Sequence, residues 1–299
     1  MKHFAKRITA FAVAALLIIS VAAIQAGAAI EYRLNGFIFD LINNTTATIT
    51  GYENQTPDMV IPDKLLEIKV VSIANDAFKG NTEIASVDFS QALYLDKIGV
   101  SAFAGCSGIS GELVLPESIT SIMYSAFQEC TSISSAVINA NIKNIPQWCF
   151  YRCYSLETVL LPDGLETIER AAFAGCTSLS YVNIPANVTE ISEYSFSDCP
   201  DLTLGVWFGS YGHEYAQSHN IPYILLDSVL LGDANGDGYV NISDVTDIQR
   251  AVAEMDTLDD LRQKAADING DGVVTIDDAT FLQTYLAEFG TAYPIGEVA

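Results

Sequence analysis

Basic residues are scarce in this chain. It has 14 lysines and arginines against 37 aspartates and glutamates, which gives a formal net charge of −23. Nucleic acid is a polyanion, and the proteins that bind it present a basic face to its phosphates. The charge balance therefore argues against a nucleic-acid partner.

Histidine and the usual catalytic motifs are also lacking. Outside the N-terminal segment the only histidines are His213 and His219, which would lie on different faces of a helix. No nucleophile elbow, phosphate-binding loop or zinc signature occurs. Carboxylates are numerous, but no spacing singles out a general acid and base. We therefore expect no catalytic residue and interpret the chain as a non-enzyme.

Long apolar runs are missing everywhere except at the N-terminus. There, three basic residues precede an apolar run from Ile8 to Ile24, and small residues follow it. This arrangement predicts a secretory signal peptide over residues 1–28, with cleavage after Ala26 or Ala28. An uncleaved membrane anchor is the alternative, because the run is close to the roughly 20 residues that span a bilayer. We expect a secreted mature protein without a membrane span.

Two acidic segments near the C-terminus share one spacing. Residues 233–244 and 267–278 each place side-chain oxygens at positions 1, 3, 5 and 12 and glycine at position 6, with an offset of 34 residues. This is the pattern of an EF-hand calcium loop, in which position 7 lends its carbonyl and position 9 acts through water. The alternative is a pair of acidic, glycine-rich turns on a solvated surface. Because the same spacing occurs twice, we favour the interpretation as calcium loops.

Both segments differ from an ordinary EF-hand. Position 12 is aspartate in both, and the first loop follows a short apolar stretch instead of an entering helix. Apolar residues at the i, i+3, i+7 spacing predict a helix with one buried stripe after each loop. The stripes are Val245, Ile248 and Val252, and Ala279, Leu282 and Leu286. Residues 256–265 predict a short connecting helix with Leu258 and Leu261 inward.

A duplicated calcium loop with an exiting helix, closed by aspartate, resembles a type I dockerin. The resemblance implies a small all-α module that folds on two Ca²⁺ ions and binds a cohesin domain of a scaffolding or cell-surface protein. It also implies the ligands. The first loop would use Asp233, Asn235, Asp237, Tyr239, Asn241 and Asp244, and the second Asp267, Asn269, Asp271, Val273, Thr275 and Asp278.

The same resemblance implies a cohesin-binding surface at the loop ends and on the exiting helices. Its residues would be Ile242, Ser243, Gln249 and Arg250 in the first half, and Ile276, Asp277, Gln283 and Thr284 in the second. The alternative is that these are merely exposed helix residues. The two halves differ at Ser243 against Asp277 and at Arg250 against Thr284, which favours a single binding orientation over a dual one.

A repeat of 23 residues fills most of the remaining chain. Phe127, Phe150, Phe173 and Phe196 stand 23 apart, and isoleucines and cysteines keep the same interval. A unit of this length cannot enclose its own apolar residues, whereas stacked units can. The pattern predicts a solenoid of short strands and tight turns. It resembles the BspA-like leucine-rich repeats of bacterial surface proteins.

The expected fold class is therefore a leucine-rich repeat solenoid followed by a small all-α dockerin with two EF-hand-like calcium loops. We expect the repeat domain at 29–227, with a cap at each end. A linker at 228–231, the dockerin at 232–290 and a C-terminal tail at 291–299 follow.

Five of the six cysteines share one slot of the repeat, and Cys149 occupies a slot that other units fill with alanine or serine. Coils lie about 4.8 Å apart, beyond the roughly 3.8 Å between β-carbons that a disulfide prefers. Free buried thiols are favoured, although disulfides stay an alternative.

Several aromatic residues fall outside the phenylalanine series and are candidates for surface contacts or for ordinary half-buried packing. They are Tyr124, Trp148, Tyr151, Tyr154, Tyr181 and Tyr194.

The function that follows is a secreted, non-catalytic adaptor, which a calcium-dependent dockerin attaches to a cohesin of a cellulosome-type extracellular complex. The solenoid would bind an unknown protein or glycan. The alternatives are a dockerin-borne hydrolase or protease inhibitor, and a free-standing calcium-stabilised adhesin. The sequence does not say which cohesin is bound or what the repeats recognise.

Overall fold

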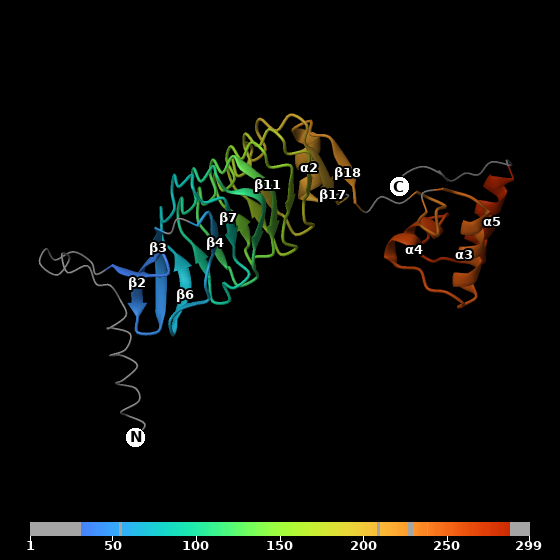
Figure 1. Ribbon diagram of the computed structural model, residues 1–299. Helices are drawn as coiled ribbons and strands as arrows, with labels where there is room; N and C mark the ends of the chain where they lie inside the picture. The colour runs from blue at the N-terminus through green and yellow to red at the C-terminus, as the bar shows by residue number, and fades with distance from the viewer. Residues whose placement is uncertain (1–30, 54–55, 208–209, 227–229, 238, 288–299) are drawn as a thin grey trace, which may run out of the picture. The chain divides into compact units, whose positions relative to one another are not determined.

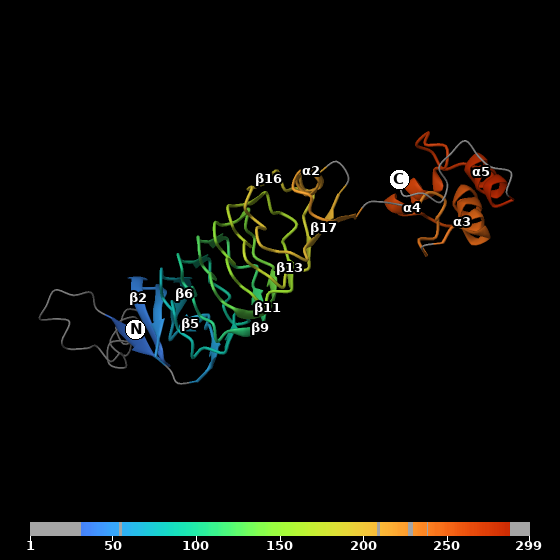
Figure 2. The same ribbon diagram turned by 90° about the horizontal axis from the view of Figure 1, so that it is seen from above.

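The computed structural model describes residues 31–53, 56–207, 210–226, 230–237 and 239–287. They form two compact units divided between Ile224 and Leu225, and each unit is described by itself (Figures 1 and 2). The predicted signal peptide, the predicted tail and part of the predicted linker lie outside the described residues. No helix in these described ranges has both the length and the apolar character needed to cross a membrane.

The first unit is a solenoid of short parallel strands, as predicted (Figure 1). Its long sheet has the order β18-β17-β15-β13-β11-β9. These strands are β9 (Ser110–Leu115), β11 (Ser132–Ile138), β13 (Thr158–Leu160), β15 (Tyr181–Asn183), β17 (Thr203–Val206) and β18 (Tyr223–Leu225). Within the repeat, Ala136 pairs with Val159 and Val159 with Val182 in register. The buried positions of successive coils therefore lie directly above one another.

A second series of strands, each two residues long, runs along another side of the coils. It consists of β8 (Lys97–Ile98), β10 (Ser121–Ile122), β12 (Asn144–Ile145), β14 (Thr167–Ile168) and β16 (Glu190–Ile191). In each strand the isoleucine is buried and its neighbour is more exposed, so the inward residue recurs once per coil. This alternation is the period of two that a strand imposes.

An antiparallel hairpin begins the solenoid. It joins β2 (Phe37–Asn43) to β3 (Thr46–Tyr52), with β1 (Tyr32–Leu34) on the outer edge of β2. Strand β3 then pairs in parallel with β6 (Ile68–Ile73), which begins the repeated pattern. The short β5 (Lys64–Leu65) also pairs with β6, and β4 (Asp58–Val60) pairs with β7 (Ser86–Asp88).

Backbone hydrogen bonds also link the coils on their turn side. In the coil of Phe150, the N–H groups of Trp148, Phe150 and Arg152 donate to carbonyls of the next coil at 3.2, 2.8 and 2.9 Å. From the Phe78 coil to the Phe173 coil, the residues two before and two after the phenylalanine are left-handed, whereas in the Phe196 coil only the residue two after is. We call them the first and second left-handed positions. The first is held by Asp76, Ser101, Ser125, Trp148 and Ala171, and the second by Gly80, Gly105, Glu129, Arg152, Gly175 and Asp198.

A stack of phenylalanine rings forms the centre of the core. The ring centroids of Phe127, Phe150, Phe173 and Phe196 lie 5.4 to 5.5 Å apart along the series, with interplanar angles of 9° or less. Tyr215 of the C-terminal helix meets the last ring edge-on. Because each ring is covered by its counterparts, the unit depends on stacking between coils and not on any single coil.

The cysteines line the same core and are free thiols. This is the alternative that their shared position in the repeat favours. Each cysteine of that slot donates its S–H to the phenylalanine carbonyl of the preceding coil, for example from Cys130 to Phe103 at 3.1 Å and from Cys176 to Phe150 at 3.1 Å. Burial raises the pKa of these thiols, to about 12 for Cys106. The slot therefore selects a small, buried, hydrogen-bonding side chain.

Helix α2 (Tyr211–Ser218) packs on the last coils. A Cβ at Gly212 would lie 2.8 Å from Ile184 Cγ2, so the helix approaches the coil closely only because this residue is glycine. His213 is buried against Tyr223, and His219 stacks on Tyr215. Both histidines thus have structural contacts in the cap.

The second unit contains α3 (Ile242–Val252), α4 (Asp260–Ala266) and α5 (Ile276–Leu286). Helices α3 and α5 pack against each other. The core comprises Leu231, Ala234, Val245, Ile248, Ala266, Ile268, Ala279 and Leu282, with five half-buried apolar residues against it. This core is small, so the loops that precede α3 and α5 carry much of the organisation.

Candidate calcium loops and docking face

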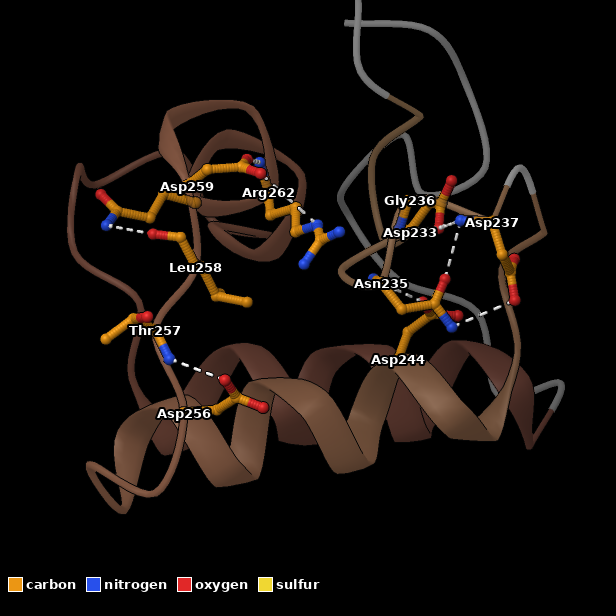
Figure 3. A network of polar contacts seen from close by, with 11 residues as sticks. Asp233, Asn235, Gly236, Asp237, Asp244, Asp256, Thr257, Leu258, Asp259 and Arg262 are labelled. Carbon is orange, nitrogen blue, oxygen red and sulfur yellow. Dashed lines mark hydrogen bonds and ion pairs between the residues drawn. The ribbon is translucent and has the colours of Figure 1, made fainter.

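The first loop is folded by its own acidic side chains (Figure 3). Asp233 Oδ1 accepts hydrogen bonds from the N–H groups of Gly236 and Asp237 at 2.8 and 3.1 Å. Asn235 Oδ1 accepts from Asp237 N–H at 2.8 Å, and Asp237 Oδ1 accepts from Tyr239 N–H at 2.9 Å. Such side-chain-to-backbone bonds mimic backbone turns. They gather the side-chain oxygens of positions 1, 3 and 5 in one tight loop.

The second loop repeats this arrangement. Asp267 accepts hydrogen bonds from the N–H groups of Asp271 and Gly272 at 3.1 and 2.8 Å. Asn269 Oδ1 accepts from Asp271 N–H at 2.8 Å, and Asp271 Oδ1 accepts from Val273 N–H at 2.9 Å. Gly272 at position 6 has φ +86°, a conformation that L side chains rarely adopt. Local structure therefore explains the glycine at this position without any ion.

Asp244, at position 12 of the first loop, has two structural roles. It is fully buried, and its Oδ2 accepts from Asn241 N–H at 2.8 Å to complete a capping box at the start of α3. Its Oδ1 accepts from Asn235 N–H at 3.2 Å, which closes the loop. Burial raises the pKa of Asp244, whereas the two N–H groups oppose that rise.

Asp278 has the same roles in the second loop. It is fully buried, and its Oδ1 accepts from the N–H groups of Ile268 and Asn269 at 2.9 and 3.3 Å. Its Oδ2 accepts from Thr275 N–H at 2.8 Å, as part of the capping box that begins α5. The short aspartate, where most EF-hands have glutamate, thus joins loop closure to helix capping.

The donor set of both loops fits calcium. Each provides three carboxylates and one amide oxygen, the hard oxygen ligands that Ca²⁺ prefers. Asn241 and Thr275 at position 9 are the N-cap residues of α3 and α5, and their side-chain oxygens accept backbone N–H groups. Tyr239 and Val273 at position 7 have exposed side chains, as expected for residues that contribute only a carbonyl. Across the described residues, no three His, Cys, Asp or Glu side chains form a ready metal cluster.

The residues predicted to bind a partner lie on α3 and α5. Ile242 and Ile276 occupy equivalent first positions of their helices and are 64% and 53% exposed. The other predicted residues are also exposed except Thr284, which is half-buried and donates its hydroxyl hydrogen to the Thr280 carbonyl. Arg250 forms a 3.5 Å ion pair with Asp256. The two helices thus present an exposed apolar residue beside each loop.

Three details of the predicted helices are wrong. The connecting helix begins at Asp260 and not near 256, and Leu261 on it is exposed. Val252 is also exposed, because α3 ends there and the small core covers only the first two turns of its stripe. A periodic pattern identifies a helical face but does not show how far the partner element reaches along it.

Comparison with known families identifies both units. Residues 71–203 match the BspA type leucine rich repeat region, in six copies, and residues 231–287 match the dockerin type I domain. The chain carries a BspA-type leucine-rich repeat region and a type I dockerin domain. A type I dockerin implies a cohesin partner, and domains of this type typically bind calcium. Leucine-rich repeat and dockerin domains are non-catalytic binding modules.

Several solved structures are similar to the repeat fold. A leucine rich cell surface protein from Faecalibacterium prausnitzii A2-165 is 27% identical, with coverage of 59% of this chain and 54% of that one and a TM-score of 0.45. The leucine rich repeat protein of T. pallidum is 25% identical over 57% of this chain and 69% of that one, with a TM-score of 0.41. A leucine-rich repeat protein from Bacteroides ovatus is 24% identical over 59% and 52%, with a TM-score of 0.44.

This chain therefore spans only about half the length of the first and third of these structures. No curated protein matches it.

Some relevant residues were not found from the sequence pattern. The repeat gave no reason to single out Arg152 and Arg170, yet each guanidinium lies over a tyrosine ring, Tyr151 and Tyr194 respectively, at 4.9 and 5.4 Å. The signal available was their rarity, because residues 101–226 contain only three basic side chains.

Proposed function

We propose that this protein is a secreted, non-catalytic adaptor. Its dockerin binds a cohesin in a calcium-dependent manner and so attaches the leucine-rich repeat solenoid to a cellulosome-type extracellular complex. The observation that carries the proposal is the matched pair of loops in which a buried aspartate both closes the loop and caps the helix bearing an exposed isoleucine. Secretion is supported by the N-terminal leader pattern and by the extracellular occurrence of both kinds of module.

Two calcium ions are proposed, one per loop. Each ion is held by the side chains at positions 1, 3, 5 and 12, by the carbonyl at position 7 and by water on position 9. The loop hydrogen bonds link positions 1, 3, 5 and 12 of each loop, and the calcium charge offsets the repulsion between the carboxylates. Formation of the loops in turn fixes the first turns of α3 and α5, where Ile242 and Ile276 project.

Substitutions on the two helices test the docking face in the full chain. Binding to a panel of type I cohesins is measured by native gel shift and titration calorimetry, with calcium and then with EGTA. We expect a complex only with calcium, and we expect the double variant Ile242→Asp with Ile276→Asp to lose it. Met255→Asp is the matched control, because Met255 is an exposed apolar residue of the same unit outside the proposed face.

The single variants determine the orientation. With one preferred orientation, one isoleucine substitution abolishes binding and the other is tolerated, whereas a dual mode tolerates either alone. The adaptor proposal is overturned if no cohesin binds in calcium, or if EGTA leaves a complex intact.

A further inference from the structure

Three aromatic side chains stand on the turn side of one coil. Trp148 and Tyr154 are 39% and 43% exposed, and Tyr151 is half-buried. The equivalent residues of the following coil are short at the first two of these positions: Ala171 lies beside Trp148, and Ala174 lies beside Tyr151. Both alanines are short and are themselves buried, so their side chains do not cover the partly exposed rings.

Trp148 occupies the first left-handed position with φ +57°. Four other coils place aspartate, serine or alanine in this conformation, and the Phe196 coil has Tyr194 at the same point without it. A bulky aromatic residue in the left-handed region is unusual. Its N–H donates to the Arg170 carbonyl and its carbonyl accepts from Tyr151 N–H, each at 3.2 Å, so its backbone is held on both sides. The indole is thus presented from a fixed backbone where the repeat itself favours a small residue.

Two arginines lie over tyrosine rings in this part of the solenoid. The Arg152 guanidinium lies over Tyr151, and its nearest carboxylate is Glu129 at 3.9 Å. A Cβ at Gly175 would meet Arg152 Cγ at 3.1 Å, so the arginine stem extends over the next coil.

Arg170 lies over the ring of Tyr194, which is 48% exposed. Within the described residues Arg170 forms no ion pair. In a strongly acidic chain, this guanidinium is available to an external carboxylate.

We propose that these residues form a binding site for a polysaccharide that carries scattered uronic acid groups. The site, here called the aromatic–arginine patch, consists of Trp148, Tyr151, Arg152, Arg170 and Tyr194. Pyranose rings have apolar C–H faces that pack on aromatic rings, and a guanidinium pairs with a carboxylate in two-pronged geometry. The inference deepens the proposed adaptor function by naming the ligand class of the solenoid.

The charge of the molecule limits the density of acid groups on the ligand. The chain has a net charge of −23, so a densely anionic polymer is repelled over most of the surface. The exposed aliphatic residues Val114 and Leu160 lie on β9 and β13 of the long sheet and not in the patch. Aromatic rings with isolated cations suit a sugar chain with occasional carboxylates; tryptophan, tyrosine and arginine are also common in protein hot spots, so a protein partner is one outcome of the test.

Affinity electrophoresis of the full chain tests this inference with three polymers: glucuronoxylan, xylan freed of its uronic acids, and polygalacturonate. We expect the strongest retardation with glucuronoxylan, less with the neutral xylan, and least with polygalacturonate. Binding of glucuronoxylan should fall about tenfold or more in Trp148→Ser. Ser101 and Ser125 hold the same left-handed position in other coils, so this variant is compatible with the fold.

Two further variants separate stacking from charge. Arg170→Gln, which copies Gln147 of the preceding coil, should weaken binding to glucuronoxylan and leave binding to neutral xylan unchanged. Tyr94→Ala is the matched control, because Tyr94 is also an exposed tyrosine under a cation, Lys69, but lies outside the patch. It should bind as the unsubstituted chain does, and all variants should keep its thermal midpoint.

The inference is overturned if glucuronoxylan causes no retardation, if Trp148→Ser leaves it unchanged, or if Tyr94→Ala weakens it equally. Stronger binding to polygalacturonate than to glucuronoxylan would contradict a ligand with scattered acid groups. Selective binding of a protein that depends on Trp148 would show that the ligand is a protein and not a glycan. Cohesin binding measured on the same variants should not change. If the unsubstituted chain binds glucuronoxylan but no cohesin, the adaptor proposal is contradicted and the proposed sugar site stands.

Discussion

Removal of calcium should unfold the dockerin and leave the solenoid folded. At calcium concentrations about 1,000-fold above a site's dissociation constant, binding stabilises the folded state by about 4 kcal/mol, hence about 8 kcal/mol for two sites. A domain of this size has a total stability of only about 3 to 9 kcal/mol, at 0.05 to 0.15 kcal/mol per residue. The small core of eight buried residues gives no reason to expect more. Chelation therefore removes most or all of the stability of this unit.

The two units have separate spectroscopic signals. Helices α3, α4 and α5 have 11, 7 and 11 residues, whereas the solenoid has the 8-residue α2 in its described part. Both tryptophans, Trp148 and Trp207, precede the dockerin. EGTA should thus remove most of the helical circular dichroism while tryptophan fluorescence stays unchanged. Unaltered helicity and unaltered amide exchange across residues 232–287 after chelation would refute this reasoning.

Single substitutions distinguish loop charge from general acidity. Asp271→Ala removes one proposed ligand and should raise the calcium concentration needed for half-maximal helicity. Asp256→Asn removes an acidic side chain outside both loops, whose carboxylate pairs with Arg250 at the surface and accepts from Thr257 N–H, a bond that the asparagine Oδ1 can keep. Surface ion pairs contribute about 0 to 1 kcal/mol, so this control should shift the calcium titration little. Equal shifts for the two variants would show that the effect is not specific to the loop.

Three further predictions concern the solenoid. Phe150→Ala should lower its free energy of unfolding by about 3 to 5 kcal/mol in urea denaturation, because the ring is fully buried between two others; a loss below about 1 kcal/mol would contradict the stacked core. Burial raises the pKa of Cys106 to about 12, above its ordinary value of 9.0. Between these two pH values the thiol therefore stays protonated in the folded state, whereas it is ionised in the unfolded chain. This thiol should not change the urea midpoint below about pH 9, and the midpoint should fall as pH rises toward 12. In Cys106→Ala the midpoint should fall less steeply with pH. Equal pH dependence in the two proteins would show that Cys106 does not contribute. Gly175→Ala should destabilise by about 1 to 2 kcal/mol, because φ is +76° and its Cβ would meet Arg152. Gly164→Ala, where the nearest atom would be 3.9 Å away, should be neutral or stabilising in the same assay.

The repeat shows how a periodic sequence predicts structure. A constant 23-residue interval of phenylalanine, isoleucine and cysteine has one efficient solution, in which like side chains cover one another, and the described coils adopt it. The left-handed positions were not predicted. Serine, tryptophan, alanine and arginine have no shared propensity for that conformation, so it is imposed by hydrogen bonding between adjacent coils.

In the dockerin, spacing alone identified the loops, because side-chain oxygens at these fixed intervals around a glycine are typical of calcium loops. The second role of Asp244 and Asp278 as helix caps depends on how each loop folds back on its own helix, and only the structure shows it.

What the sequence determined by itself is local and periodic: the loops, the repeat interval and the absence of catalytic motifs. The tertiary structure decided which side chains meet across coils, as for Arg170 and Tyr194, which lie in successive repeats and not in one motif. It also decided that Val252 and Leu261 are exposed, since the small core ends before it reaches them. Contacts between coils depend on stacking geometry, which the residue pattern within a single coil does not contain.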